Sequence, residues 1–219
     1  NLFKQNKVKL PIFGNYGVAM IFFPKNQKLI HQCKKIIHEV LEVYQLEVFY
    51  ERSVPTDNKV LSKVMQDSAP SIQQLFIKHK REKIVSDKLN IRLFLVGKII
   101  GNKISLESKK NKLLKNFNFC SISNTTINYK GMLLSDLVRK YFIDLNNENY
   151  KSNFALIHQR FSTNTFPSWD LAQPFKMICH NGEINTVRGN VNWMNARKLK
   201  MNSKILGNSL KKIWPLIEY

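Results

Sequence analysis

Apolar and polar residues follow two different periods in the first part of this chain. An apolar run at 16–23, ended by Pro24, is typical of a buried strand. Apolar residues then recur at helical spacing through 29–44, and Asn26 stands where its side chain can cap the first turn. The sequence therefore predicts a strand followed by an amphipathic helix, with Cys33 as a small buried residue on the apolar stripe.

The rest of the pattern predicts, in chain order, a strand at 46–54, a turn at 55–58, a strand at 74–77, a helix at 84–100, an exposed basic loop at 109–116, a β-hairpin at 117–129, a short helix at 133–142, a strand at 154–157, an ordered loop at 164–173 and a helix at 186–199. The hairpin is predicted because two apolar runs flank Ser123 and Asn124. Residues 91–96 alone also match a strand, and Asn185 is a candidate cap for the last helix. No repeat or linker interrupts the chain, so we expect one domain over residues 1–219, with sheets covered by helices on their outer faces.

The composition permits a sizeable core, since 43% of the 219 residues are hydrophobic and 11% are aromatic. No apolar run has the length of a membrane span, and the first residues lack the apolar core of a signal peptide. The cysteines, three in number and without metal-ligand spacing, argue against a disulfide framework or a zinc site. Because the chain begins with Asn, we expect a piece of a longer protein.

A formal net charge of +20, from 35 Lys and Arg against 15 Asp and Glu, raises the alternative of a basic nucleic-acid-binding module. The surplus is mostly Lys, spread with Asn and Ile along the whole chain. This spread favours the compositional bias of an A+T-rich genome and a solvated surface over a specific nucleic-acid site. A nucleic-acid module would predict steep salt dependence of binding and exposed base-stacking aromatic residues.

Two places near the C-terminal end have residue types suited to chemistry. Arg160 stands where the predicted strand at 154–157 becomes a loop, and from there a guanidinium can bind a carboxylate through two parallel hydrogen bonds. A structural salt bridge explains this residue equally well. Asn181 and Gly182 can both direct N–H groups at a developing oxyanion, although Asn-Gly is also a common turn dipeptide. Residue type alone leaves both alternatives open at each place.

Other polar and aromatic residues of this region fit structural roles. Cys179 and His180 are neighbours, and neighbours in a strand point to opposite faces, so this pair is badly placed to exchange a proton. His180 and His158 therefore fit hydrogen-bonded structural imidazoles better than general bases. Trp169 and Trp193 are more typical of a core than of a ligand pocket.

Four ordered blocks carry a resemblance to a known family. They read HQRFSTNTFPSW at 158–169, AQPF at 172–175, HNGEINT at 180–186 and GNVNWMNAR at 189–197. Further similarity lies at 16–24, 46–55 and 129–134, so that it covers nearly the whole chain from about Leu10. The set resembles the glutamine amidotransferase domain of glutamate synthases, which are class II amidotransferases of the N-terminal nucleophile type.

The resemblance implies a fold and a set of roles. The fold is α+β, a four-layer αββα sandwich with two antiparallel sheets packed face to face between helices. In the family, an N-terminal Cys attacks the side-chain amide of glutamine and forms a glutamyl thioester while ammonia leaves. Carried over by position, Arg160 holds the substrate α-carboxylate, and Asn181 with Gly182 forms the oxyanion hole. Thr163 and Asn164 lie along the glutamine pocket.

Two features of the family pattern are not found in this sequence. The family nucleophile is a Cys at the mature N-terminus ahead of a glycine-rich strand, and none of Cys33, Cys120 and Cys179 stands in that context. The family also holds the substrate ammonium with an acidic residue after a Trp-Pro-rich helix, and the sequence ends at Tyr219 before such a segment. We therefore expect an interior piece of the domain, incomplete at both ends, that hydrolyses no glutamine by itself.

For the parent enzyme, the resemblance implies a glutamate synthase that converts glutamine and 2-oxoglutarate into two glutamates. FMN and a 3Fe-4S cluster are expected in later domains, and no cofactor or metal is expected in this chain. The Lys-, Asn- and Ile-rich composition indicates a plastid (chloroplast stroma) and ferredoxin as the electron donor; a bacterial cytoplasm and a pyridine nucleotide are the alternatives. Another class II amidotransferase, acting on a sugar phosphate or nucleotide precursor, is disfavoured by the FPSW and GNVNWM blocks.

Overall fold

The computed structural model of the chain describes residues 3, 8–80, 86–162, 166–175, 178 and 186–217. The strands in this part are β1 (Tyr16–Phe23), β2 (Leu46–Ser53), β3 (Ser71–His79) and β4 (Asn118–Ser123). The α-helices are α2 (Gln27–Val43), α3 (Lys63–Ser68), α4 (Ser86–Ser108), α5 (Val138–Tyr141) and α6 (Val187–Arg197).

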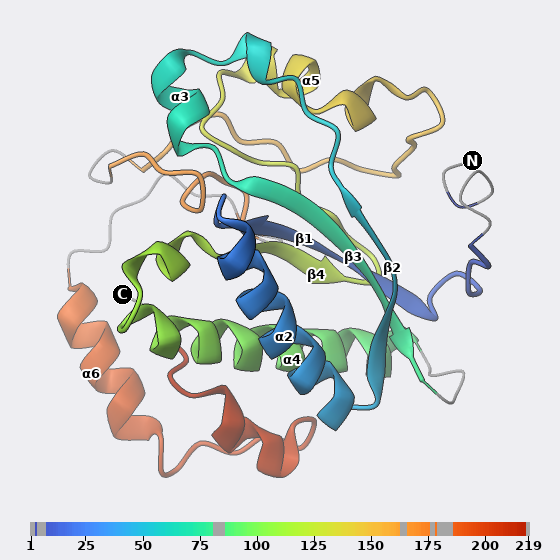
Figure 1. Cartoon of the computed structure of the whole chain (residues 1–219). Coiled ribbons are helices and arrows are strands. Elements are labelled where there is room, and N and C mark those ends of the chain that lie inside the picture. Colours follow the sequence, from blue (N-terminus) through green and yellow to red (C-terminus); the bar gives the residue numbers. More distant parts are fainter. Residues whose placement is uncertain are drawn as a thin grey trace.

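The strands form one antiparallel sheet in the order β2-β3-β1-β4. The chain runs β1–α2–β2–β3–α4–β4, and Figure 1 shows α2 and α4 on the same face of the sheet. This strand order with a one-sided helix layer is the split βαβ arrangement of ferredoxin-like folds. The described part of the chain is therefore α+β, as predicted, with one sheet where the expected sandwich has two.

Strand β1 lies inside the sheet because both of its faces are apolar. Ala19, Ile21 and Phe23 belong to the core that the sheet shares with α2 and α4, and Met20 and Phe22 belong to a second core on the opposite face. All five side chains are at most 2% exposed. A strand that is buried on both faces reads as a continuous apolar run, which is the pattern that predicted β1.

Helix α2 begins where its sequence predicts. The Asn26 side chain accepts hydrogen bonds from the backbone N–H groups of Lys28 at 2.9 Å and Leu29 at 3.4 Å. This cap satisfies two N–H groups that have no partner inside the helix. The buried stripe of α2 includes Cys33, which is fully buried and confirms the prediction of a small core residue.

The face of the sheet opposite the helices is covered largely by residues 127–145. A polar network lies on this face. Gln74 of β3, only 2% exposed, accepts a hydrogen bond from Arg52 Nε at 2.7 Å. Arg52 also donates to both carboxylate oxygens of Asp144, which in turn accepts from the Tyr129 hydroxyl at 2.8 Å. The network ties β2 and β3 to the covering segment and leaves these polar groups paired.

The predicted hairpin at 117–129 is wrong in its second half. Strand β4 forms and pairs with β1, but residues 125–129 contain no strand. The backbone N–H of Asn128 donates to the side-chain oxygen of Ser121 at 3.1 Å, and its side-chain amide donates to the Cys120 carbonyl at 3.1 Å. These side-chain bonds hold the returning segment beside β4 in place of a backbone ladder.

The strand predicted at 154–157 is also not formed. This segment has no regular secondary structure, and none of the described strands pairs with it. Phe154 is 62% exposed and Ile157 is 82% exposed. An apolar run becomes a strand only where a neighbour supplies backbone partners, and the described residues supply none here.

Other predicted elements differ from the structure mainly in extent. Strand β3 is longer than the apolar run at 74–77, because it pairs with neighbours on both sides. Helix α4 extends eight residues beyond the predicted end at Ile100, and it excludes the strand alternative for 91–96. The predicted exposed loop at 109–116 is wrong in part, because it contains the 3₁₀ helix Lys112–Asn116, whose Leu114 is buried in the helix-side core.

The C-terminal part agrees with prediction where it is described. Residues 166–173 contain no helix or strand, and α6 lies within the helix predicted at 186–199. The candidate cap Asn185 lies outside the described residues. After α6, the 3₁₀ helix Gly207–Ile213 returns to the helix-side core (Figure 1). None of the described helices is both long enough and apolar enough to cross a bilayer.

Candidate functional site

Arg160 is the one predicted site residue that the described part of the chain contains. It lies near the end of residues 151–162, a stretch without regular secondary structure, and its side chain is exposed. The guanidinium forms no hydrogen bond or ion pair with another described residue. An exposed guanidinium without a carboxylate partner in this part of the chain is available to a carboxylate ligand.

The other candidate residues lie outside the described part: Thr163, Asn164, Cys179, His180, Asn181 and Gly182. Their roles therefore stay predictions. His158 is described and half-buried, and its Nε2 atom is buried without a hydrogen-bond partner among the described residues. The loop 166–175, which is described, connects the Arg160 block to the block that contains Asn181.

Trp169 anchors this loop to the second core. It is 5% exposed, and its ring packs edge-to-face on Phe22 with centroids 6.0 Å apart and at a tilt on Tyr141 at 5.7 Å. The indole N–H donates to the Ser68 hydroxyl at 3.2 Å, so the polar atom of the buried ring has a partner. The core prediction is confirmed for Trp169 and wrong for Trp193, which is 69% exposed.

Two polar residues form a second anchor for the loop. Lys130 is 5% exposed; its Nζ donates to the Asp170 carbonyl at 2.7 Å and lies 4.9 Å from the centre of the Phe175 ring. The side-chain amide of Asn128 donates to the Pro174 carbonyl at 3.3 Å. Burial lowers the pKa of Lys130, because the ammonium has lost most of its hydration. The middle and the C-terminal end of the loop are thus held by buried side chains.

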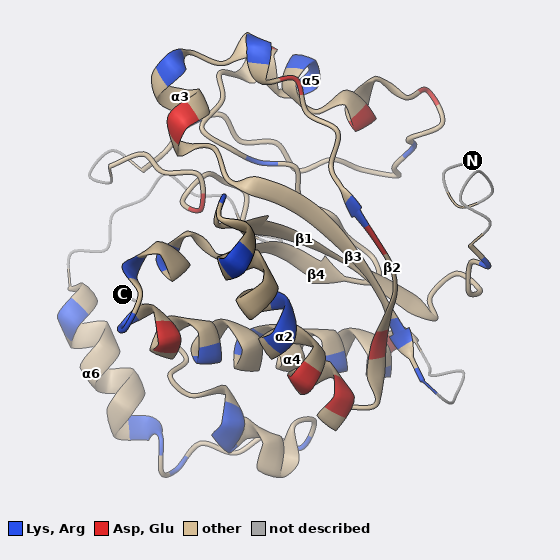
Figure 2. Ribbon diagram, in the orientation of Figure 1, with Lys and Arg blue, Asp and Glu red and all other residues tan. Residues whose placement is uncertain are grey.

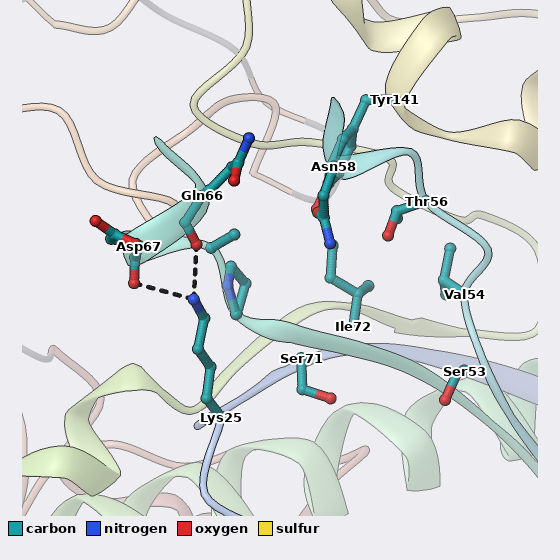
Figure 3. Close-up of a pocket in the computed structure, with 12 residues that line it drawn as sticks. Lys25, Ser53, Val54, Thr56, Asn58, Gln66, Asp67, Ser71, Ile72 and Tyr141 are labelled. Atoms are coloured by element: carbon teal, nitrogen blue, oxygen red, sulfur yellow. Dashed lines mark hydrogen bonds between the residues drawn. The ribbon is translucent and has the colours of Figure 1, made fainter. Parts of the chain in front are cut away.

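A cavity of about 430 Å³ lies elsewhere, near the end of β2, the start of β3 and α3 (Figure 3). Lys25 reaches across one end of it and donates to the backbone carbonyls of Gln66 at 2.6 Å and Asp67 at 3.1 Å. Thr56 and Tyr141 are among the residues that line the other end. Arg160 is not among the described residues that line this cavity.

Basic residues are spread over the described surface. Figure 2 shows Lys and Arg on α2, α3, α4 and α6 and on the chain after α6, without one continuous stripe. Several have acidic partners, such as Lys34 with Glu51 at 3.0 Å and Lys78 with Glu47 at 3.2 Å. The surface agrees with a solvated, compositionally basic protein and gives no support to the nucleic-acid alternative.

The two described cysteines are inert core residues. Burial raises the pKa of Cys33 to about 11 and that of Cys120 to about 12, so both thiols stay protonated near neutral pH. No group of three or more His, Cys, Asp and Glu among the described residues has the arrangement of a metal site.

Comparison with known proteins decides the family. The family described as glutamine amidotransferases class-II matches residues 1–219, the whole chain. The chain belongs to the class II glutamine amidotransferases. The blocks at 158–169 and 180–186, which carried the resemblance, thus lie within a confirmed amidotransferase sequence.

Glutamate synthases are similar to this class II amidotransferase chain over most of its length. The glutamate synthase [NADH] of Saccharomyces cerevisiae is 41% identical over 217 residues, which is 95% of this chain and 10% of the relative. The ferredoxin-dependent glutamate synthase 1, chloroplastic/mitochondrial, of Arabidopsis thaliana is 39% identical over 91% of this chain and 12% of the relative. The ferredoxin-dependent glutamate synthase of Pyropia yezoensis is 38% identical over 99% of this chain and 14% of the relative. The chain thus spans between 10% and 14% of the length of these relatives.

These relatives favour glutamate synthase over the other class II amidotransferases. They do not distinguish the electron donor, because one is named for NADH and two for ferredoxin. They do not single out a plastid location either, since yeast and cyanobacterial enzymes match beside chloroplastic ones.

Sequence reasoning missed Lys130 and Asn128 as buried contacts of the loop 166–175. Because the chain contains 35 Lys and Arg, Lys130 could not be distinguished by residue type from lysines on the solvated surface. Asn128 was assigned to a strand that does not form. The one signal in the sequence was that Lys130 lies in the block 129–134, which is part of the family resemblance, and that Asn128 directly precedes this block.

Proposed function

We propose that this chain is the glutamine-hydrolysing part of a glutamate synthase. The observation that carries the proposal is its 38–41% identity to three glutamate synthases over at least 91% of its length. In the parent reaction, glutamine and 2-oxoglutarate, with two electrons and two protons, give two molecules of glutamate. The part that this chain belongs to breaks the C–N bond of the glutamine side-chain amide and releases ammonia.

Within this function, we assign Arg160 to the α-carboxylate of glutamine. The support is its exposed guanidinium, which has no acidic partner in the described part of the chain. Thr163 and Asn164 line the glutamine pocket next to it. Asn181 and Gly182 donate N–H groups to the oxyanion that forms when a thiolate attacks the amide carbon. The attacking thiol is not assigned to Cys33 or Cys120, whose burial keeps them protonated.

We also propose that residues 1–219 lie in one amidotransferase domain, whose αββα sandwich is formed outside the β1–β4 sheet. Both faces of that sheet are covered, one by α2 and α4 and the other largely by 127–145, so it has no open face for a second sheet.

The proposal places FMN and a 3Fe-4S cluster in other parts of the parent enzyme, with ammonia passing to them internally. The cofactors supply the electrons that reduce the product of ammonia and 2-oxoglutarate. We propose ferredoxin as the donor and a plastid as the location, on the basis of the Lys-, Asn- and Ile-rich composition and the chloroplastic relatives. A pyridine nucleotide and a bacterial cytoplasm are the alternatives.

The test uses the full-length polypeptide that carries this chain, with Asn181→Ala. We expect glutamine-dependent glutamate formation to fall about 100-fold or more, because one oxyanion donor is lost. Glutamate formation from added ammonium chloride should be unchanged, because ammonia bypasses the amide cleavage. The assigned role of Asn181 would be contradicted if both activities fell equally or if neither changed. A wild-type protein that forms no glutamate from either nitrogen source would refute the proposed function.

A further inference from the structure

Lys130 is the most deeply buried charged residue near the amidotransferase motif blocks, and none of the substrate-binding or oxyanion roles above belongs to it. Only 5% of it is exposed. Its ammonium group forms no ion pair with a described residue; instead, it donates to a backbone carbonyl, that of Asp170, at 2.7 Å. Its second contact is the face of the Phe175 ring, with Nζ 4.9 Å from the centroid. Both partners lie in the loop 166–175.

The segment that carries Lys130 is itself fixed to the sheet. Asn128, two residues earlier, donates from its backbone to the Ser121 side chain at 3.1 Å and from its amide to the Cys120 carbonyl at 3.1 Å. Ser121 and Cys120 belong to β4, which pairs with the buried strand β1. The same Asn128 amide also donates to the Pro174 carbonyl at 3.3 Å. The loop is thus connected through Lys130 and Asn128 to strand β4 and, by strand pairing, to the buried strand β1.

The contacts of the loop continue to its far side. Phe175 and Ile178 exchange two backbone hydrogen bonds, with N···O distances of 2.7 and 2.8 Å. Ile178 stands three residues before Asn181 in the sequence, and Asp170 stands ten residues after Arg160. Asp170 and Phe175 thus lie in the stretch of sequence between Arg160 and the predicted oxyanion residues.

We propose that Lys130 is a positioning residue for glutamine hydrolysis, which fixes the loop 166–175 between Arg160 and the oxyanion residues by bridging the Asp170 carbonyl and the Phe175 ring. This inference rests on the proposed function. A buried amine is costly to desolvate, and burial lowers its pKa here, so its retention at this position needs a compensating contact. That contact is the hydrogen bond to the Asp170 carbonyl, which an apolar side chain cannot donate.

The test substitutes Lys130→Met in the full-length polypeptide, since Met keeps the unbranched stem and removes the donor. Lys25→Met is the matched control, because Lys25 also donates to two backbone carbonyls, those of Gln66 and Asp67, but does so beside α3. For Lys130→Met we expect kcat for glutamine hydrolysis to fall about 10- to 100-fold, as for a catalytic group misplaced by about 1 Å. The KM for glutamine should change less than about threefold, because Arg160 still binds the carboxylate.

Two further measurements separate positioning from loss of fold. Hydrogen exchange at the amides of Phe175 and Ile178 should become faster in Lys130→Met and stay unchanged in Lys25→Met. Glutamate formation from added ammonium chloride should be unchanged in both variants. A wild-type kcat in Lys130→Met, or a loss matched by the ammonia-dependent activity, would overturn the inference while leaving the proposed function intact. A wild-type protein without glutaminase activity would refute the proposed function instead.

Discussion

The sheet region and the motif region of this chain differ in how they bury apolar side chains. In the sheet, Phe22 and Phe23 are at most 2% exposed. In the region that carries the amidotransferase motif blocks, Phe154 is 62%, Phe166 is 94% and Leu199 is 96% exposed. The sheet region therefore holds itself together, whereas the motif region depends on a few anchors to it. The four blocks from 158 to 197 that carry most of the family resemblance thus lie in the region that contributes least to the described core.

The largest expected difference between the two regions is in how much the loss of one phenylalanine ring lowers the free energy of unfolding. Phe23→Ala removes a fully buried ring that packs on Phe117, with centroids 5.6 Å apart, and should lower the free energy of unfolding by about 3–5 kcal/mol. Phe166→Ala, the same change in the motif region, should alter it by less than about 0.5 kcal/mol. Urea unfolding of the two variants measures both values. Equal losses would show that the two regions share one core.

A second prediction concerns the contact between the two regions. A Cβ atom at Gly131 would lie 2.5 Å from the Trp169 ring, so Gly131→Ala should displace this anchor and cost about 1–3 kcal/mol. Gly101→Ala is the control, since a Cβ there meets nothing within 4 Å and helix α4 should gain about 0.5–1 kcal/mol. Urea unfolding, monitored by tryptophan fluorescence, should show a lower free energy of unfolding for Gly131→Ala and a higher one for Gly101→Ala. Wild-type stability in Gly131→Ala would mean that Trp169 is held loosely.

The smallest expected effect is the alkaline sensitivity of the buried sheet core. Burial raises the pKa of Cys33 to about 11, from an ordinary value of 9.0, so the folded state keeps a proton that the unfolded state loses. The stability from this thiol is complete below about pH 9 and is lost as pH rises toward 11. Replacement of the thiol by Cys33→Ala should make the decline in unfolding free energy between these pH values shallower, by at most about 1 kcal/mol per pH unit. Parallel declines in the two proteins would show that Cys33 is not shielded from water.

The sequence predicted the sheet region well where local pattern and tertiary packing agree. Asn26 and the apolar spacing after it located α2, because both the cap and the stripe are local features. Strand β3 was predicted too short, because its ends are polar and the strand is extended by pairing on both sides. The hairpin failed because β4 pairs with β1, about a hundred residues earlier, and no local turn signal reports such a pairing.

For the motif region, the sequence predicted the family correctly but not the contacts that anchor the region or the conformation of residues 154–157. The blocks around Arg160 and Asn181 identified the family, because a long ordered match is specific even where each residue is ambiguous. The anchor Lys130 was not predicted, since its burial depends on Asp170 and Phe175, which approach it only in the folded chain. Residues 154–157 were predicted as a strand from apolarity alone, and apolarity does not supply a pairing partner.

The proposed binding of the glutamine α-carboxylate by Arg160 is tested most directly by the KM for glutamine of the full-length enzyme with Arg160→Met. The control is Arg139→Met, which removes an exposed guanidinium from helix α5. There, Arg139 Nε donates a hydrogen bond to the Asn146 side chain. Loss of two charge-assisted hydrogen bonds, together about 3 kcal/mol, should raise the KM about 100-fold in Arg160→Met and leave it unchanged in Arg139→Met. Glutamate formation from ammonium chloride should be unaffected in both. A KM in Arg160→Met within about twofold of wild type would show that Arg160 does not bind the α-carboxylate.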